Sequence, residues 1–399
     1  MKNYNIDEFG AKKGCLSTSA IQAAIDACAE NGGGRVFVTD GSYITGTLFM
    51  KSNVHLYIDA SATLIMSNDI VDFPDFACEW NVKAAPRNSA RCMIYVGNCE
   101  NVTIGGMGTI DCNGSAFCVP NPTPKHSDTD PFLCQRMKRT KPDEETVGRM
   151  IFVMKSKNVT LCDFTMSEMA GGWGIWVNGS EYINIRALKM YCCPDYPNSD
   201  GIHINCSRDV FVSDCAVHTG DDAIIVRANT NTLGEDIPCE NVVLKGCTLS
   251  SHCQAIRIGW IGDGAIRNCV FSDIVITDSR DAITIELPAN SVAADLGKNS
   301  TRIERLSFNN ILVDRTARYP IQMVVSDSPL VRCEYMRNIQ FNNMNCRTSQ
   351  FPRLVGRKDC YIEDIVFSNC RFDVTDRAAD GFKPRYVRGL KTDCEWNVE

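Results

Sequence analysis

Three aspartates stand at a spacing that could bring several carboxylates to one place in the fold. They occur in the segment 197–227, PNSDGIHINCSRDVFVSDCAVHTGDDAIIVR, as Asp200, Asp221 and Asp222. Asp200 and Asp221 are 21 positions apart, and the residues between them alternate apolar and polar side chains, as half-buried strands do. If this length is one turn of a strand repeat, stacking would align the two aspartates about 4.8 Å apart. Carboxylates at such spacing perturb one another's pKa, so that one can hold a proton while another acts as a base.

The residues beside these aspartates also suit ordinary turns. Asn198, Gly201 and Gly220 are of the types that occur wherever a chain reverses. One such turn would say little about function. An NSDG segment followed one repeat later by GDD favours acid–base chemistry over coincidence.

A similar phrase returns along the chain and would supply the strands that position the carboxylates. It reads NVTIGGMGTI at 101, NVTLCDFTM at 158, YINIRALKM at 182, DVFVSDCAV at 209 and NVVLKGCTL at 241, and it continues to IEDIVFSNCRF at 362. From position 158 onward the starts are 24 to 38 residues apart. A short, uneven period of strands without helix-length patterns between them is typical of a β-solenoid. A β-sandwich is the alternative, but the returning Asn-x-apolar-x-apolar phrase favours the solenoid.

We predict one all-β domain over residues 1–399, with special roles for three segments. Residues 1–50 would form an N-terminal cap and first coil, because Ala20–Cys28 has the apolar spacing of a short helix that could cover the open end of the stack. Residues 112–148 are too long for one coil and are predicted to leave the stack as an excursion beside the cleft. Residues 375–399 would cap the far end.

Composition excludes some classes of partner. The chain is 44% hydrophobic and 22% charged, as soluble globular proteins are. Its net charge of -7 and isoelectric point near 5.4 argue against nucleic acid, which binds to basic surfaces. No apolar run approaches the roughly 18 residues that span a membrane. Met1-Lys2-Asn3 begins the chain without an apolar signal segment, so we expect a cytoplasmic location.

The 22 cysteines fit a reduced interior better than a disulfide framework. Six of them recur at one place in the repeat: Cys162, Cys215, Cys247, Cys269, Cys346 and Cys370. Because a free cysteine behaves as a small buried hydrophobe, we expect them to form a stacked ladder inside the coils. The Cys192-Cys193 pair has no histidine at ligand spacing, so no metal site is expected.

At the aspartate segment the chain resembles glycoside hydrolase family 28, the polygalacturonase-like members of the pectin-lyase-like β-helix superfamily. The family's NTD motif appears as Asn198-Ser199-Asp200, its DD motif as Gly220-Asp221-Asp222 and its GHG motif as Ser251-His252-Cys253. FGA, GGG and GTLFMKSNVHLYIDASATL near the start resemble the opening of bacterial members, and the resemblance covers roughly residues 5–370. It implies a right-handed parallel β-helix that hydrolyses glycosidic bonds without a cofactor.

One family motif, RIK, is missing from the chain. Thr284-Ile285-Glu286 stands at its expected place, where the family's Arg and Lys contact the carboxylate of a uronic acid. A glutamate there would repel an acidic sugar. The missing motif therefore argues against polygalacturonate as the substrate, but not against hydrolysis of a glycosidic bond. Arg257 or Arg227 could replace the missing cations, and strand alternation alone leaves both possibilities open.

Glycosidic cleavage needs one acid to protonate the leaving oxygen and one carboxylate to act on water or the sugar. The resemblance implies inversion of configuration, with Asp221 as the acid and Asp200 with Asp222 positioning the water. The residues alone do not rank Asp221 above Asp222, because neighbours in a strand point to opposite faces. His252 is expected to hydrogen-bond a catalytic aspartate and tune its pKa.

The remaining expected site residues would contact an oligosaccharide or polysaccharide substrate. Asn198, Arg257 and Glu286 are placed there by the motifs, and Trp173 and Trp260 are expected to stack on sugar faces. Trp176 lies in an alternating strand and suits the core equally well. In the cytoplasm the substrate would be an imported oligosaccharide, which favours cleavage at a chain end.

Two other functions fit parts of the sequence. A β-helical polysaccharide lyase would abstract the proton next to a uronate carboxylate, often with the help of Ca²⁺. The ordered NSD, GDD and histidine motifs argue against it. A non-catalytic carbohydrate-binding solenoid would explain the altered GHG and the missing RIK.

Overall fold

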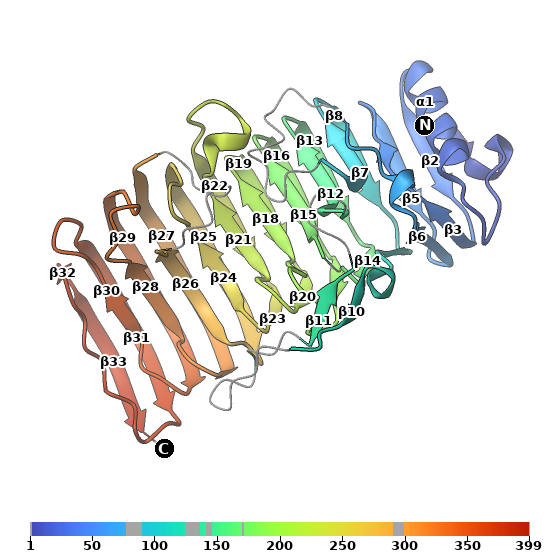
Figure 1. Ribbon diagram of the computed structural model, residues 1–399. Helices are drawn as coiled ribbons and strands as arrows, with labels where there is room; N and C mark the ends of the chain where they lie inside the picture. The colour runs from blue at the N-terminus through green and yellow to red at the C-terminus, as the bar shows by residue number, and fades with distance from the viewer. Residues whose placement is uncertain are drawn as a thin grey trace.

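The chain folds into a long stack of coils whose strands run parallel from one coil to the next (Figure 1). In the computed structural model the described residues are 2–76, 90–123, 132, 136–140, 146–169, 171–289 and 299–398. The stack begins beside helix α1 (Thr18–Glu30) and ends at β33 (Lys391–Val398), so the two termini lie at opposite ends. The predicted all-β, right-handed parallel β-helix with a short N-terminal helix is confirmed.

One face of the stack is a ten-stranded parallel sheet, which we call the site sheet because it carries the aspartates. Its strands are β4 (Leu48–Phe49), β7 (Cys92–Gly97), β12 (Arg149–Met154), β15 (Trp173–Asn178), β18 (Ile202–Asn205), β21 (Ile224–Arg227), β24 (Gln254–Ile258), β26 (Asp281–Leu287), β28 (Ile321–Val325) and β30 (Arg353–Val355).

The other faces belong to one larger sheet, which starts as two runs of strands. The first run is β1 (Asn3–Asn5), β2 (Gly34–Val38), β5 (Val54–Ile58), β8 (Glu100–Gly105), β13 (Lys157–Cys162), β16 (Glu181–Arg186), β19 (Arg208–Ser213) and β22 (Cys239–Lys245). The second run is β3 (Gly41–Thr45), β6 (Ala62–Met66), β9 (Thr109–Asp111), β14 (Thr165–Ser167), β17 (Lys189–Tyr191), β20 (Ala216–Thr219) and β23 (Thr248–Ser251).

The two runs join where β22 and β23 both pair with one long strand, β25. From there each coil has a single long strand on this side: β25 (Ala265–Thr277), β27 (Thr301–Thr316), β29 (Cys333–Thr348) and β31 (Ile362–Val374), followed by β32 (Val387–Arg388) and β33. The described part also has short 3₁₀ turns at Ile6–Phe9, Ile70–Asp72, Gly114–Ala116 and Thr230–Thr232.

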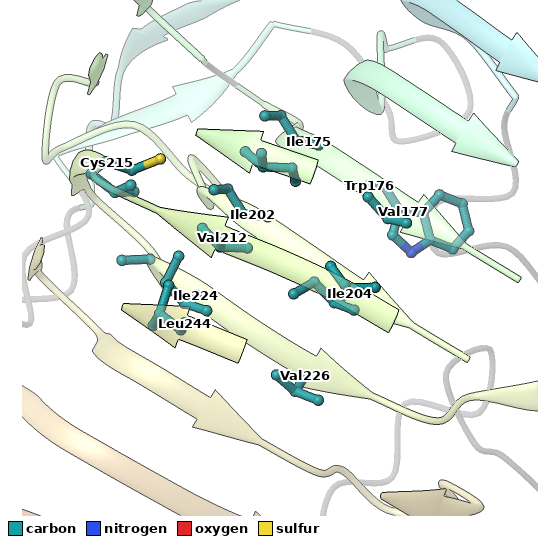
Figure 2. Close-up of a cluster of buried hydrophobic side chains, with 14 of the residues drawn as sticks. Ile175, Trp176, Val177, Ile202, Ile204, Val212, Cys215, Ile224, Val226 and Leu244 are labelled. Atoms are coloured by element: carbon teal, nitrogen blue, oxygen red, sulfur yellow. The ribbon is translucent and has the colours of Figure 1, made fainter. Parts of the chain in front are cut away.

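Side chains alternate across the site sheet between the core and the outer face. Ile175, Ile202 and Ile224 occupy one register on successive strands and are fully buried (Figure 2). Their neighbours along each strand therefore point outward, because successive side chains of a strand point to opposite faces. This alternation fixes which residues can reach a substrate.

The asparagine that opens the repeated phrase turns a corner of each coil. Asn101 and Asn158 have φ of 58° and 54°, in the left-handed region that asparagine tolerates better than most residues. Their amides also stack from coil to coil, with Asn158 Nδ2 donating to Asn101 Oδ1 at 2.8 Å and Asn101 Nδ2 donating to Asn53 Oδ1 at 2.9 Å. The phrase recurs because every coil has the same corner to turn.

The interior is filled by buried side chains, and some of them stack on identical ones. The six cysteines expected to stack inside the coils are all buried, as expected. They do not form one continuous ladder, because Cys269 pairs with Val242 and Leu306 and Cys346 pairs with Val313. In the later coils Phe271, Phe308, Phe341 and Phe367 stack with ring centroids 4.7 to 4.9 Å apart. Each ring packs face to face on the ring of the coil before it.

Helix α1 covers the first coil. Its buried side chains include Ile21, Ala24 and Ile25, and it packs against β1, β2, β4 and β5. At the other end, the segment after β31 adds β32 and β33, which pair in parallel with β31. No helix among the described residues is long and apolar enough to cross a membrane.

The predicted excursion includes an antiparallel hairpin, β10 (Cys118–Pro120) and β11 (Met137–Arg139). Part of the excursion, including His126 and the charged run at Glu144-Glu145, lies outside the described residues.

The phenylalanine stack yields a stability prediction. Phe308 is fully buried between two rings, so Phe308→Ala should lower the free energy of unfolding by about 3–5 kcal/mol. Phe211 is 50% exposed, and Phe211→Ala should change it by less than about 0.5 kcal/mol. Urea denaturation followed by circular dichroism measures both values. Equal losses in the two variants would contradict the ladder as a source of stability.

Candidate active site

The three aspartates lie directly before two neighbouring strands of the site sheet. Asp200 precedes β18, and Asp221 and Asp222 precede β21. Because Ile202 pairs with Ile224, counting back along both strands sets Asp222 opposite Asp200. The backbone bond from Gly201 N to the Asp222 carbonyl, 2.9 Å, agrees with this register. The expectation that Asp221 would stack on Asp200 is therefore wrong by one residue.

Gly220 allows the two aspartate segments to approach each other. A Cβ at this position would lie 2.5 Å from the Pro194 carbonyl oxygen and 2.6 Å from Ser199 Oγ. The glycine N–H instead donates to Ser199 Oγ at 3.1 Å. The chain bends here, which brings Asp221 and Asp222 to the same site although they are neighbours in sequence.

Asp222 is buried, and each of its two side-chain oxygens accepts a hydrogen bond. The backbone N–H of Gln254 donates to Oδ1 at 3.1 Å, and the Arg257 guanidinium donates to Oδ2 at 3.2 Å. Arg257 also donates to the Gln254 side-chain oxygen at 3.1 Å. A carboxylate with an N–H and a cation on its two oxygens is fixed in orientation.

Asp221 is the aspartate whose environment favours the protonated form. Burial raises its pKa well above the ordinary value, and the nearby charges of Asp200 and Asp222 raise it further. Its Oδ1 accepts the N–H of Asp222 at 3.0 Å, and Asn198 Nδ2 lies 3.5 Å from its Oδ2. Hydroxyls of Thr219 and Ser251 bond its carbonyl at 2.5 and 2.8 Å, which anchors the backbone.

His203 is a site residue that sequence reasoning missed. Its Nε2 lies 3.0 Å from Asp200 Oδ2, and Trp173 stacks on its ring with centroids 3.8 Å apart and planes 13° apart. Burial lowers the pKa of His203 well below its ordinary value, so the neutral ring donates an N–H to the Asp200 carboxylate. The alternation of side chains along the strand could have revealed it. His203 pairs with Trp176 of the neighbouring strand, and both side chains lie on the outer face of the site sheet.

Arg257, and not Arg227, contacts the aspartates. Arg227 makes two bonds to Asp263, at 2.7 and 2.8 Å, so its guanidinium is held in a separate internal ion pair. Arg257 lies between Asp222 and Glu286, whose Oε2 is 4.0 Å from its NH2. Burial alone would lower the pKa of Arg257, but Asp222, Cys253 and Glu286 together raise it above its ordinary value, so this cation lies among acidic groups.

The predicted tryptophans border the cluster. Trp260 has the Arg257 guanidinium 3.9 Å from its ring centre, and Trp173 has the His203 ring on one face. Both indoles are partly exposed, so each has surface left for a ligand. Trp176 is buried and stacks on Phe152, with ring centroids 4.6 Å apart, on the outer side of the site sheet.

The excursion reaches this cluster from the side. Arg139 of β11 donates to the Asn198 side-chain oxygen, and Asn198 in turn faces Asp221. Phe132 packs edge-on against the His252 ring, with centroids 4.9 Å apart. His252 follows β23 and bonds the Thr219 carbonyl through its backbone N–H at 3.2 Å. A histidine–aspartate hydrogen bond is made by His203, at Asp200. The bond expected between His252 and an aspartate stays a prediction.

One group of described residues has the spacing of a metal site. Ligand atoms of Asp221, Asp222 and Cys253 lie within 4.8 Å of one another. Burial raises the pKa of the Cys253 thiol well above its ordinary value, and the two aspartates add to the shift. A protonated thiol is a poor metal ligand, and Cys253 Sγ instead lies 3.0 Å from the Gln254 side-chain oxygen. The arrangement therefore suits proton chemistry better than metal binding.

The sequence profile of glycosyl hydrolases family 28 matches residues 58–343, which include the whole cluster. The chain belongs to this family. A probable polygalacturonase of Vitis vinifera is 24% identical over 281 residues, 68% of this chain and 54% of the relative. An exo-poly-alpha-D-galacturonosidase of Dickeya chrysanthemi is 28% identical over 269 residues, 59% of this chain and 43% of the relative. The chain thus spans about half the length of these family members.

The fold of the family is also found by comparison with solved structures. An exopolygalacturonase from Thermotoga maritima superposes with a TM-score of 0.74 at 16% identity, covering 99% of this chain and 92% of that one. At this identity the likeness establishes the parallel β-helix and no more.

The charges around Asp221 can be tested without a substrate. The Asp221 carboxyl carbon, followed by ¹³C NMR, should titrate above the ordinary pKa of about 3.9. Asp200→Asn removes a neighbouring negative charge and should lower this pKa, whereas Arg257→Gln removes a positive charge and should raise it. Loss of the resonance in Asp221→Asn identifies it. An unchanged titration in both variants would contradict the electrostatic coupling.

Proposed function

We propose that this protein hydrolyses a glycosidic bond in a pectic or related oligosaccharide, with inversion at the anomeric carbon. The observation that carries the proposal is the raised pKa of Asp221 beside two further carboxylates. A carboxyl group whose pKa is raised, placed beside further carboxylates, is what acid–base cleavage of an acetal requires.

Asp221 would protonate the leaving glycosidic oxygen. Asp200 and Asp222 would hold the attacking water on the other side of the sugar, and the two differ in their partners. Asp222 accepts a hydrogen bond from Arg257, which fixes its orientation and suits it to orienting the water. Asp200 accepts a hydrogen bond from the neutral His203 ring at 3.0 Å, and we assign it the role of accepting the proton of the water.

Inversion is carried over from the family resemblance. Oxygens of Asp221 and Asp222 lie within 4.8 Å, closer than the roughly 6.5–9.5 Å usual between the carboxyl groups of inverting enzymes. The stereochemistry is therefore measured directly, by NMR of the first anomer released.

The substrate is proposed to differ from polygalacturonate at the sugar beside the scissile bond. Glu286 takes the position of family cations, and Arg257 is already engaged by Asp222 and Glu286. A uronate carboxylate placed there would meet net negative charge. A neutral sugar, or an esterified one, fits this position better.

Asp221→Asn should lower kcat on a cleaved pectic oligosaccharide by about 10²–10⁴-fold, because general-acid catalysis contributes about that much. In the parent, kcat should fall as pH rises through the raised pKa of Asp221, since the acid is lost when it ionises. A reducing-end assay over a panel of pectic and neutral oligosaccharides measures both effects.

Asp163→Asn is the matched control, because Asp163 lies in an exposed turn paired with Arg186 and should keep full activity. Products that carry an ultraviolet-absorbing double bond would show that the protein is a lyase and not a hydrolase. Tight binding with no turnover, and no difference between the parent and Asp221→Asn, would indicate a carbohydrate-binding solenoid.

A further inference from the structure

A large cleft opens on the last coils, on the same sheet that carries the aspartates. It has a volume of about 1420 Å³ and is lined by the ends of β28 and β30 and the loops beyond them. A second cleft of about 470 Å³ adjoins it. The two share three residues, Arg353, Val355 and Arg385, so they form one continuous hollow. We call this hollow the distal groove.

The strand register connects the distal groove to the active site. Arg257 pairs with Thr284, Thr284 with Gln322, and Gln322 with Arg353. These residues alternate with core residues such as Ile283 and Leu354, so all of them stand on the outer face. Three steps of about 4.8 Å place Arg353 about 14 Å from Arg257 along the stack, a distance that a short oligosaccharide spans.

A parallel line of outward positions leads to the second arginine. Glu286 pairs with Val324, Val324 with Val355, and Val355 with Arg385. Arg353 and Arg385 are thus diagonal neighbours on adjacent coils, about 8 Å apart from the strand spacing and rise. Two guanidinium groups at this separation can contact the same anionic residue or two successive ones.

Both guanidiniums are exposed and available. Arg353 donates to the Gln322 side-chain oxygen at 3.1 Å and lies 5.7 Å from the Tyr319 ring centre. Within the described ranges, neither Arg353 nor Arg385 pairs with a carboxylate, whereas the exposed Arg371 and Arg388 pair with Asp373 and Glu363. Unpaired neighbouring cations repel each other, so their placement calls for a ligand.

The distal groove is positive on a negative protein. Its basic side chains are Arg332, Arg353, Arg357, Lys358, Lys383 and Arg385, and its acidic ones are Asp327, Asp359 and Asp380. Two of the acids are held by neighbours, Asp359 by Arg357 and Asp380 by Lys383. The whole chain has a net charge of -7, so the positive groove is a local feature.

We propose that the distal groove binds a carboxylate-bearing sugar of the same oligosaccharide whose bond is cleaved at Asp221. The chain of the substrate would run along the site sheet, with a neutral or esterified sugar beside Glu286 and an acidic sugar at Arg353 and Arg385. This inference rests on the proposed function and names the substrate class, a partly neutralised acidic oligosaccharide. In this arrangement the cations that bind a sugar carboxylate lie not beside the scissile bond but about three coils from Arg257 toward the C-terminal end.

The test compares partly methyl-esterified oligogalacturonides with fully esterified ones of the same length. Parent protein gives kcat and KM, and Asp221→Asn protein gives Kd by calorimetry. Arg353→Gln/Arg385→Gln removes both groove cations. Arg371→Gln/Arg388→Gln removes the same charge from exposed, paired arginines of the same last coils and controls for long-range electrostatics.

The partly esterified probe should bind about ten- to a hundredfold more tightly, as expected for charged hydrogen bonds. The groove variant should lose this preference through KM, with kcat unchanged, and the control variant should keep it. Rising salt should weaken the preference in the parent and not in the groove variant.

If the parent and the groove variant both hydrolyse the probes with the same preference for the partly esterified one, the distal groove does not bind the acidic sugar. The proposed hydrolysis would still stand. Binding that depends on Arg353 and Arg385, without turnover by the parent, would contradict the proposed hydrolysis but support the distal groove as a binding site.

Discussion

The parallel register between successive coils is the constraint on which the rest of the structure depends. Backbone hydrogen bonds hold each strand directly above the equivalent strand of the coil before it, so equivalent residues meet at the strand spacing. This favours like residues in the core, where Phe308 stacks between Phe271 and Phe341. It also fixes the corners, where Asn101 and Asn158 share one backbone conformation.

At the active site the same register brings together groups that would otherwise repel each other. Asp200 and Asp222 face each other across adjacent strands, and Asp221 is bent into the same place at Gly220. The partners then separate their roles: Arg257 pairs with Asp222, His203 donates to Asp200, and Asp221 has two negative neighbours. Burial and these two neighbours raise the pKa of Asp221, so the environment sets one of three identical side chains apart.

Most of the scaffold can be predicted because its repeat is visible as a recurring motif in the sequence. The recurring motif indicated the solenoid, the spacing of Ala20–Cys28 indicated the end helix, and the recurring cysteines indicated buried positions. These features depend on local periodicity, which a sequence displays directly.

The details of the site depend on register and on ion pairs, which periodicity does not give. The pairing of Asp200 with Asp222 was misplaced by one residue because the bend at Gly220 is a matter of close approach between coils. His203 was overlooked because its importance comes from Trp173 and Asp200, which meet it only in the fold. The choice between Arg257 and Arg227 was decided by Asp263, a residue 36 positions from Arg227 in sequence.

The strands of each described coil pair with those of the coils beside it, and helix α1 covers the first coil. Such an architecture can gain or lose coils at the far end by duplication or deletion without moving the aspartates. Because the outer face of the site sheet continues to that end, each added coil would lengthen the surface that faces the substrate by one strand spacing. Under the proposed function, the number of coils beyond Arg257 therefore sets the length of surface available to a sugar chain.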